Sequence, residues 1–149
     1  MKRILLATDG SEQSPKAMSF ATEMAQRYEA RLDILHVVPG SEVPPEILNL
    51  MESDEIEEPP AAVYLEKVGK KIVESCGRAC RSLGLKPARI KTFILRGDPA
   101  NRIVKFAEEK QVEAIIMGNR GMGAIKGRLL GSVSRKVTHY AKCTCIIVK

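Results

Sequence analysis

Tryptophan is missing from this sequence, and the other aromatic residues are scarce. The chain has three phenylalanines and three tyrosines in 149 residues. Proteins that bind single-stranded nucleic acid stack the bases on aromatic side chains, and six scattered rings offer no evident platform. We therefore expect no nucleic acid partner, although the formal net charge is +6.

A long hydrophobic run is also missing from the start of the chain. The first apolar run, Ile4 to Ala7, has only four residues. A signal peptide needs roughly 7–15 apolar residues, and a membrane-spanning helix needs about 20. We expect a cytoplasmic protein without a membrane partner, and the length fits one domain over residues 1–149.

Acidic residues are absent from Ala114 to Lys149, whereas this segment contains seven Lys and Arg residues. A positive segment of this kind suits an anionic partner. The alternative is a solvated basic helix face that keeps the protein soluble.

Cysteine is limited to two pairs, Cys76 with Cys80 and Cys143 with Cys145. Their CxxxC and CxC spacings differ from the CxxC arrangement usual in zinc sites. We expect buried, unreactive thiols in preference to a zinc site or disulfides.

The pattern of apolar residues predicts a strand and a helix in regular alternation. Such an alternation predicts a doubly wound parallel sheet of five strands, with helices on both faces. Glu42 to Pro60 is acidic and rich in proline, so we expect a surface excursion there. The expected strands are 2–9, 31–38, 88–97, 112–118 and 143–149, and the expected helices begin at 14, 61, 98 and 132.

Glycine is concentrated in one place, because five of the chain's 11 glycines lie between Ile116 and Ser134. This stretch follows a buried strand and precedes a helix, where a phosphate-binding loop belongs. Ser132 and Ser134 are candidates to cap that helix or to donate to a phosphate. A flexible surface loop with a helix cap explains the composition equally well.

Two familiar phosphate loops do not fit this stretch. The Walker A pattern needs Gly-Lys-Ser/Thr, and the only Gly-Lys pair, Gly69-Lys70, lies inside an expected helix. A dinucleotide fingerprint needs an acidic residue about 20 positions further on, and no acidic residue follows.

The spacing Gly118, Gly121 and Gly131-Ser132 resembles the nucleotide loop of the universal stress protein family, in its ATP-binding branch. The segments "ILLATDGSEQS", "LDILHVV", "AIIMGNRG", "LLGSVS" and "CTCIIVK" resemble the corresponding strands and loops of the family. The resemblance implies the strand order 3-2-1-4-5, ATP as the ligand, and a homodimer that pairs through residues 143–149.

The resemblance also assigns nucleotide-binding residues. Asp9 is expected near the ribose or a Mg²⁺ ion, and an Asx-turn with Gly10 is its alternative role. The backbone of Val37 is expected to read the adenine edge. The glycines and the start of the last helix are expected under the ribose and phosphates, and Arg120, Lys126 and Arg128 are either phosphate-proximal or solvated surface residues. The full set implied around the nucleotide is Asp9, Val37, Gly118, Gly121, Gly131, Ser132, Val133 and, close to phosphate, Arg120, Lys126, Arg128 and Ser134.

Residues for catalysis are few. His36 is expected to be a core histidine bonded to backbone, and no residue is evident that would position an attacking water. We therefore expect an ATP-binding switch that hydrolyses its nucleotide slowly or not at all. The alternative is a dimeric interaction module that needs no nucleotide.

Overall fold

The computed structural model describes residues 1–12, 14–40, 60–121 and 130–149. Strands and helices alternate along this chain, as the apolar pattern predicts. The predicted excursion from Glu42 to Pro60 lies almost wholly outside the described residues. The elements in chain order are β1 (Arg3–Ala7), α1 (Ser14–Arg27), β2 (Arg31–Val38), α3 (Pro60–Ser82), the 3-10 turn η1 (Pro87–Arg89), β3 (Ile90–Arg96), α4 (Pro99–Glu109), β4 (Ala114–Gly118), α5 (Ser132–Tyr140) and β5 (Thr144–Val148).

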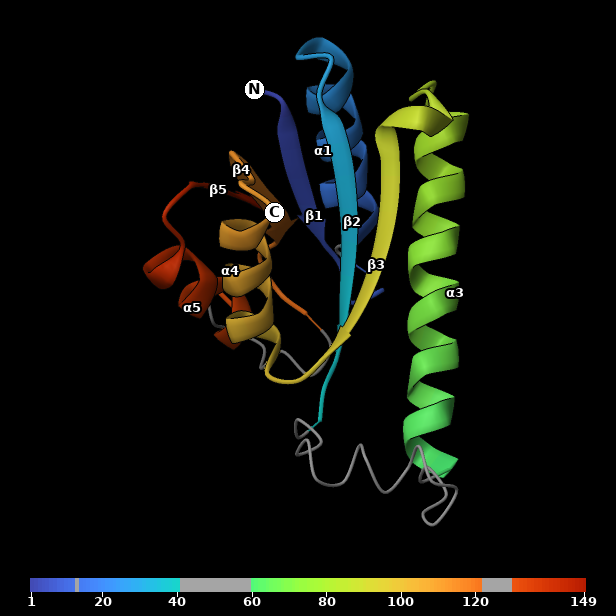
Figure 1. The fold of residues 1–149 in the computed structure, drawn as a ribbon, viewed down its shortest axis with the longest axis vertical. Helices are drawn as coiled ribbons and strands as arrows, with labels where there is room; N and C mark the ends of the chain where they lie inside the picture. The colour runs from blue at the N-terminus through green and yellow to red at the C-terminus, as the bar shows by residue number, and fades with distance from the viewer. Residues whose placement is uncertain (13, 41–59, 122–129) are drawn as a thin grey trace.

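The five strands form one parallel sheet in the order β3-β2-β1-β4-β5. The α/β class and this strand order are both confirmed. The chain runs outward from β1 to β3, then returns to β4 on the other side of β1. The winding therefore reverses between β1 and β4, which is where ligands bind in open α/β sheets. Figure 1 shows the sheet between its helices, with α3 along one side and α4 and α5 along the other.

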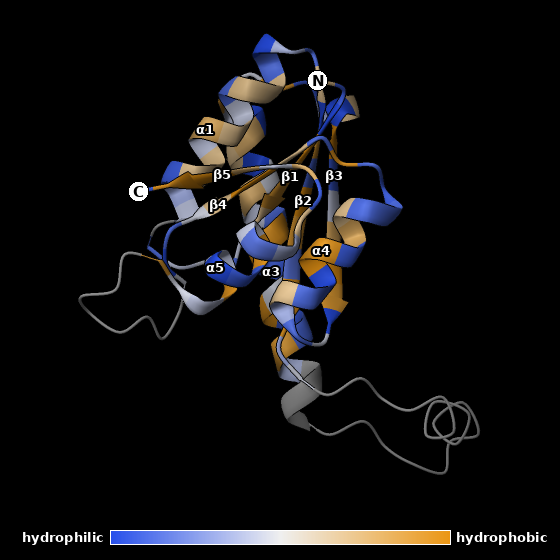
Figure 2. Ribbon diagram, turned by 90° about the vertical axis from the view of Figure 1, so that its left-hand side faces the viewer, coloured by the Kyte–Doolittle hydropathy of each residue, from blue (hydrophilic) through white to orange (hydrophobic). Residues whose placement is uncertain are grey.

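The core has two halves because successive residues of each strand point to opposite faces of the sheet. One half packs against α1 and α3 and includes Ile4, Leu6 and Ile34. The other packs against α4 and α5 and includes Leu5, Leu35 and Ile115. Figure 2 shows the strands as the most hydrophobic part of the ribbon. The central strand β1 is buried from Ile4 to Ala7, which explains why its sequence is continuously apolar instead of alternating.

Helix ends follow the local sequence. Asp98 caps α4, because its carboxylate accepts the N–H of Asn101 at 2.9 Å, and Pro99 occupies the first turn. Gly84 follows α3 in the left-handed region with φ +93°, the conformation that favours glycine after a helix.

Glycine also allows α3 to lie close to the sheet. A β-carbon at Gly69 would lie 2.8 Å from Cδ2 of His36 on β2. The helix can approach this strand only because residue 69 has no side chain.

The two cysteine pairs lie on opposite faces of the sheet. Cys76 and Cys80 belong to the α1/α3 half of the core, and Cys143 and Cys145 pack against the other half. The structure therefore brings together no zinc site from both pairs. All four are free thiols, but only Cys80 is fully buried, so the expectation of four buried thiols was too broad.

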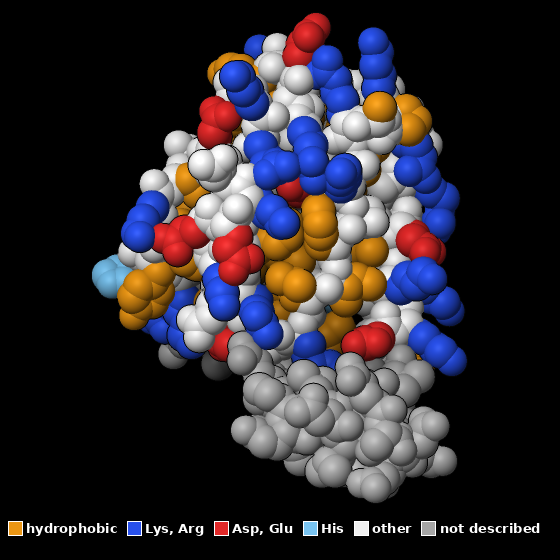
Figure 3. All heavy atoms as spheres, in the orientation of Figure 1, with side chains coloured by type: hydrophobic (Ala, Val, Ile, Leu, Met, Phe, Trp, Pro, Cys, Tyr) orange, Lys and Arg blue, Asp and Glu red, His pale blue; other side chains and the backbone are white. Residues whose placement is uncertain are grey.

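The positive charge of the C-terminal segment is partly paired. Lys136 lies 4.0 Å from Asp98, and Lys142 lies 2.7 Å from Glu108, so α4 supplies acidic partners that the segment itself lacks. Figure 3 shows Lys and Arg side chains interspersed with Asp and Glu around an apolar area. Within the described ranges, no helix combines the length and apolarity needed to cross a membrane.

Candidate functional site

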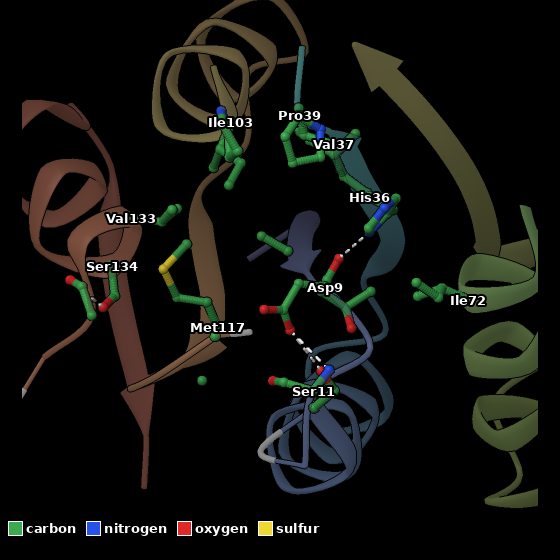
Figure 4. A pocket seen from close by; sticks show the side chains of 18 of the residues that line it. Asp9, Ser11, His36, Val37, Pro39, Ile72, Ile103, Met117, Val133 and Ser134 are labelled. Atoms are coloured by element: carbon green, nitrogen blue, oxygen red, sulfur yellow. Dashed lines mark hydrogen bonds between the residues drawn. The ribbon is translucent and has the colours of Figure 1, made fainter. Parts of the chain in front are cut away.

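A cavity of about 420 Å³ opens at the carboxyl ends of the strands, where the winding reverses. Residues from the ends of β1, β2 and β4 line it, together with residues from α3, α4 and the start of α5 (Figure 4). The structure brings nine of the expected residues together in its lining. These are Asp9, Val37, Gly118, Arg120, Gly121, Gly131, Ser132, Val133 and Ser134.

Asp9 lies just beyond the end of β1. Its Oδ1 accepts the N–H of Ser11 at 3.0 Å and the hydroxyl of Ser14 at 3.4 Å. The first of these bonds is the Asx-turn considered as an alternative role for Asp9, and Gly10 within the turn has φ +77°. Figure 4 shows the carboxylate directed into the cavity. The turn therefore holds Asp9 in place without removing it from the cavity.

Gly121 lies directly against this carboxylate. A β-carbon at residue 121 would be 2.4 Å from Oδ2 of Asp9, far closer than such atoms approach. The loop after β4 can therefore pass beside the turn after β1 only because residue 121 is glycine. Gly118, which ends β4, lies in the same lining.

The backbone of Val37 faces the cavity from β2. In a parallel strand the N–H and C=O groups of successive residues point to alternate sides. The carbonyl of Leu35 accepts from Thr8 on the β1 side, and that of Val38 accepts from Gly97 on the β3 side. The peptide groups of Val37 consequently point toward β1, beyond Ala7, where β1 ends. One peptide edge is thus left facing the cavity.

The start of α5 forms the opposite wall. Gly131 is the N-cap and provides no side-chain cap, and Ser132 is the first residue of the helix. Of the two roles considered for Ser132, this excludes the N-cap and leaves the contact with phosphate. The first-turn N–H groups, including those of Ser132 and Val133, have no acceptor within the helix. They bring the positive end of the helix dipole to the cavity.

Ser134 fixes this helix start in place. Its hydroxyl lies 3.2 Å from the carbonyl of Asn119 and 3.1 Å from that of Gly131, and the N–H of Gly131 donates to Asn119 at 2.7 Å. The hydroxyl proton is directed at protein carbonyls, which favours a positioning role over the phosphate contact expected for Ser134.

Sequence reasoning missed the apolar walls of the cavity. Met117 and Ile103 line the side toward α4, and Leu65, Val68 and Ile72 line the side toward α3. Apolar side chains at helical spacing are typical of a core, and no local signal shows that this part of α3 lines a cavity instead.

His36 contributes to both core and cavity. It is only 7% exposed, and its Nδ1 lies 2.9 Å from the carbonyl oxygen of Thr8. The prediction of a core histidine bonded to backbone is therefore confirmed. The ring also lines the cavity, which the sequence did not indicate.

Charged side chains are few among the described lining residues. Asp9 is the carboxylate and Arg120 the cation of that set, while Lys126 and Arg128 lie outside the described residues. The residues described include no group of three His, Cys, Asp or Glu side chains placed to hold a metal ion. A divalent cation bound by Asp9 would therefore need further oxygen ligands from a molecule bound in the cavity.

These features define a class of protein: a doubly wound α/β domain with a ligand-sized cavity at its topological switch point. The sequence model of the universal stress protein family matches residues 1–149, and the chain belongs to this family.

Known relatives agree with this assignment. Universal stress protein YxiE of Bacillus subtilis is 34% identical over 153 aligned residues, which cover 99% of this chain and 98% of YxiE. The structure of MJ0577 of Methanocaldococcus jannaschii has a TM-score of 0.77 at 29% identity, over 99% of this chain and 95% of that one. A universal stress protein solved in complex with cAMP has a TM-score of 0.69 at 24% identity, over 99% of this chain and 97% of the other.

Proposed function

We propose that this protein binds ATP in the cavity and acts as a nucleotide-dependent switch in a stress response. The observation that supports this most directly is the combination of three surfaces around one cavity. They are the peptide edge of Val37, the apolar side chains beside it, and the uncapped start of α5.

Each surface suits one part of the nucleotide. The peptide edge of Val37 can donate to and accept from the adenine ring, and Met117 and Ile103 offer apolar contact to its faces. The triphosphate would meet the first-turn N–H groups of Ser132 and Val133, since helix N-termini bind anions.

The ribose would lie between these two ends of the cavity. Gly118 and Gly121 leave room for it, and the Asp9 carboxylate can accept hydrogen bonds from its hydroxyl groups. Arg120, with Lys126 and Arg128, would add positive charge near the phosphates.

Magnesium fits as a companion of the nucleotide. Mg²⁺ is commonly bound by one or two carboxylates together with phosphate oxygens, and Asp9 supplies one carboxylate. With ATP bound, Asp9 would hold the ion, whose charge would offset that of the phosphates.

Slow or absent hydrolysis follows from the side chains around the cavity. His36 uses Nδ1 for the Thr8 carbonyl, and with ATP bound Asp9 would be occupied by the ribose and the Mg²⁺ ion. The described lining residues include no other carboxylate or histidine that could orient an attacking water. A stable bound nucleotide suits a switch better than it suits an ATPase.

The cAMP complex of the structural relative described above is a property of that protein. At 24% identity, the similarity between that protein and the present chain shows a shared fold and no more. The proposal for the present chain therefore depends on its own cavity.

We also propose a cytoplasmic homodimer that pairs through residues 143–149. In the described sheet β5 is an edge strand, paired with β4 on one side. Its sequence Thr-Cys-Ile-Ile-Val is apolar, and an open apolar edge invites pairing with another strand. Gel filtration with light scattering at micromolar protein should give twice the chain mass, and a monomer would contradict the proposal.

The test of nucleotide binding uses the protein as purified and after stripping. Denaturation should release adenine nucleotide that mass spectrometry identifies. Calorimetric titration of ATP into the stripped protein should show saturable binding, and Gly131→Val should weaken it by at least about tenfold, or about 1.4 kcal/mol. A branched side chain at this position would crowd the proposed phosphate site.

A matched control is Gly40→Val. Among the described residues, a β-carbon at residue 40 would meet the side chain of Arg96, at ordinary distances from 3.7 Å, and Gly40 is not one of the described residues that line the cavity. Equal ATP binding by wild type, Gly131→Val and Gly40→Val would refute the nucleotide site. A partner protein captured equally with and without ATP would favour the alternative, a nucleotide-independent interaction module.

A further inference from the structure

A cluster of sulfur atoms lies between α1 and α3, where both helices pack against the core. Cys80 is 0% exposed, and Cys76 lies one helical turn before it, half-buried against the same core. Met18 of α1 packs against this core as well. The proposed nucleotide site does not use any of these residues.

Hydrogen bonds set the register of the two helices. The side chain of Gln26 donates to the carbonyl of Leu83 at 2.8 Å, and the hydroxyl of Thr22 lies 3.2 Å from Sγ of Cys80. The contact that lies further along α1 also lies further along α3, so the two helices run in the same direction.

One turn further back, this register places Met18 opposite Cys76. The hydroxyl of Thr22 lies 3.2 Å from Sγ of Cys80 across the helices and 3.9 Å from Sδ of Met18 on its own helix. The thiol of Cys80 and the thioether of Met18 thus contact the same hydroxyl, and Cys76 lies one turn before Cys80 on α3.

The spacing of the thiols suits a bridging ion better than a disulfide. Residues at i and i+4 of a helix have β-carbons about 5–6 Å apart, whereas a disulfide requires about 3.5–4.5 Å. Two metal–thiolate bonds of about 2.3 Å span up to about 4.6 Å between sulfurs, so an ion can join Cys76 and Cys80 without unwinding α3.

We infer that Cys76 and Cys80, with Met18, form a binding site for Cu(I). Thiolate and thioether ligands are soft and select this ion, which is satisfied by two or three sulfurs and needs no larger donor set. Binding replaces the two thiol protons, which leave to solvent. The resulting site carries one negative charge.

The test isolates this cluster from the other cysteine pair. The protein with Cys143→Ser and Cys145→Ser, reduced and free of metal, is titrated anaerobically with Cu(I) against bicinchoninate. We expect one Cu(I) per chain to be withheld from the chelator. X-ray absorption should show only sulfur neighbours around the copper.

Variants of the cluster identify its ligands. In the same background, Cys76→Ser should lower Cu(I) affinity by at least about 100-fold, and Met18→Leu by about tenfold. Circular dichroism and melting temperature establish that these half-buried substitutions leave the fold intact. Release of the copper to bicinchoninate by the parent protein, or equal affinity in Cys76→Ser, would overturn the inference.

ATP titration of the parent background separates this inference from the proposed function. We expect the Cys143→Ser, Cys145→Ser protein to bind ATP as the wild type does, with or without copper. Failure of ATP binding alone would refute the nucleotide site and leave the copper site standing.

Discussion

Gly121→Ala tests the contact between the two loops of the cavity. The new β-carbon would lie 2.4 Å from Oδ2 of Asp9, whereas real β-carbons essentially never show contacts under 3.0 Å. The carboxylate would therefore have to rotate, which breaks its bonds to Ser11 at 3.0 Å and Ser14 at 3.4 Å. The structural damage should be confined to this turn.

The magnitude follows mainly from the bond to Ser11, because the contact to Ser14 at 3.4 Å is long and therefore weak. A hydrogen bond to a charged group contributes about 1.5–3 kcal/mol, and replacing glycine by alanine returns about 0.4–1 kcal/mol by restricting the unfolded chain. We expect a net loss of about 1–2 kcal/mol, which lowers the melting temperature by about 3–6 °C. Affinity for Mg-ATP should fall by about tenfold, because Asp9 leaves its place.

A double-mutant cycle with Asp9→Ala provides the assay. Urea unfolding of the wild type, both single variants and the double variant gives the coupling free energy. If the clash with Asp9 is the cause, Gly121→Ala should cost nothing once the carboxylate is gone, and the coupling should be about 1–2 kcal/mol. Additive effects of the two substitutions would refute the reasoning.

Three further substitutions test the surroundings of the cavity. Gly69→Ala places a β-carbon 2.8 Å from His36, and urea unfolding should show a loss of about 1–3 kcal/mol; unchanged stability would mean that α3 moves aside freely. Asp98→Ala removes the acceptor of the Asn101 N–H and should cost about 1 kcal/mol in the same assay, most of it retained by Asp98→Asn. Ser134→Ala removes a hydroxyl bonded to backbone carbonyls that each keep an N–H donor, and it should cost about 0.5–1.5 kcal/mol; thermal melting equal to the wild type would contradict this.

Much of the fold could be predicted because its signals are local. Asp98-Pro99 marks the start of α4, Gly84 marks the end of α3, and the apolar runs mark the strands. Alternation of strand and helix then restricts the topology, since parallel crossovers are right-handed. The order 3-2-1-4-5 itself came from the family resemblance.

The candidate site could be predicted only in part. The glycine spacing located the loop after β4, but nothing local shows that Gly121 lies against Asp9, more than a hundred residues earlier in the chain. The role of Ser134 also depends on a distant carbonyl, that of Asn119. The first contact joins two different connections of the sheet, and the second joins the end of β4 to the start of α5. Sequence spacing encodes neither contact.

The backbone edge of Val37 is a different kind of case. Its side chain carries no chemical signal, and valine is ordinary in a strand. What exposes its peptide groups is the length of the neighbouring strand, because β1 ends at Ala7 while β2 continues to Val38. Only knowledge of which strands are neighbours reveals this mismatch.

The missing side chain at Gly69 has an effect beyond its own contact. Val68 and Ile72, on the same helix, form part of the cavity wall, while Gly69 sets how near that wall stands to β2. A bulkier residue there would push the wall outward and enlarge the opening. Gly69 thus influences how large a ligand fits in the cavity, although it is not among the described residues that line it.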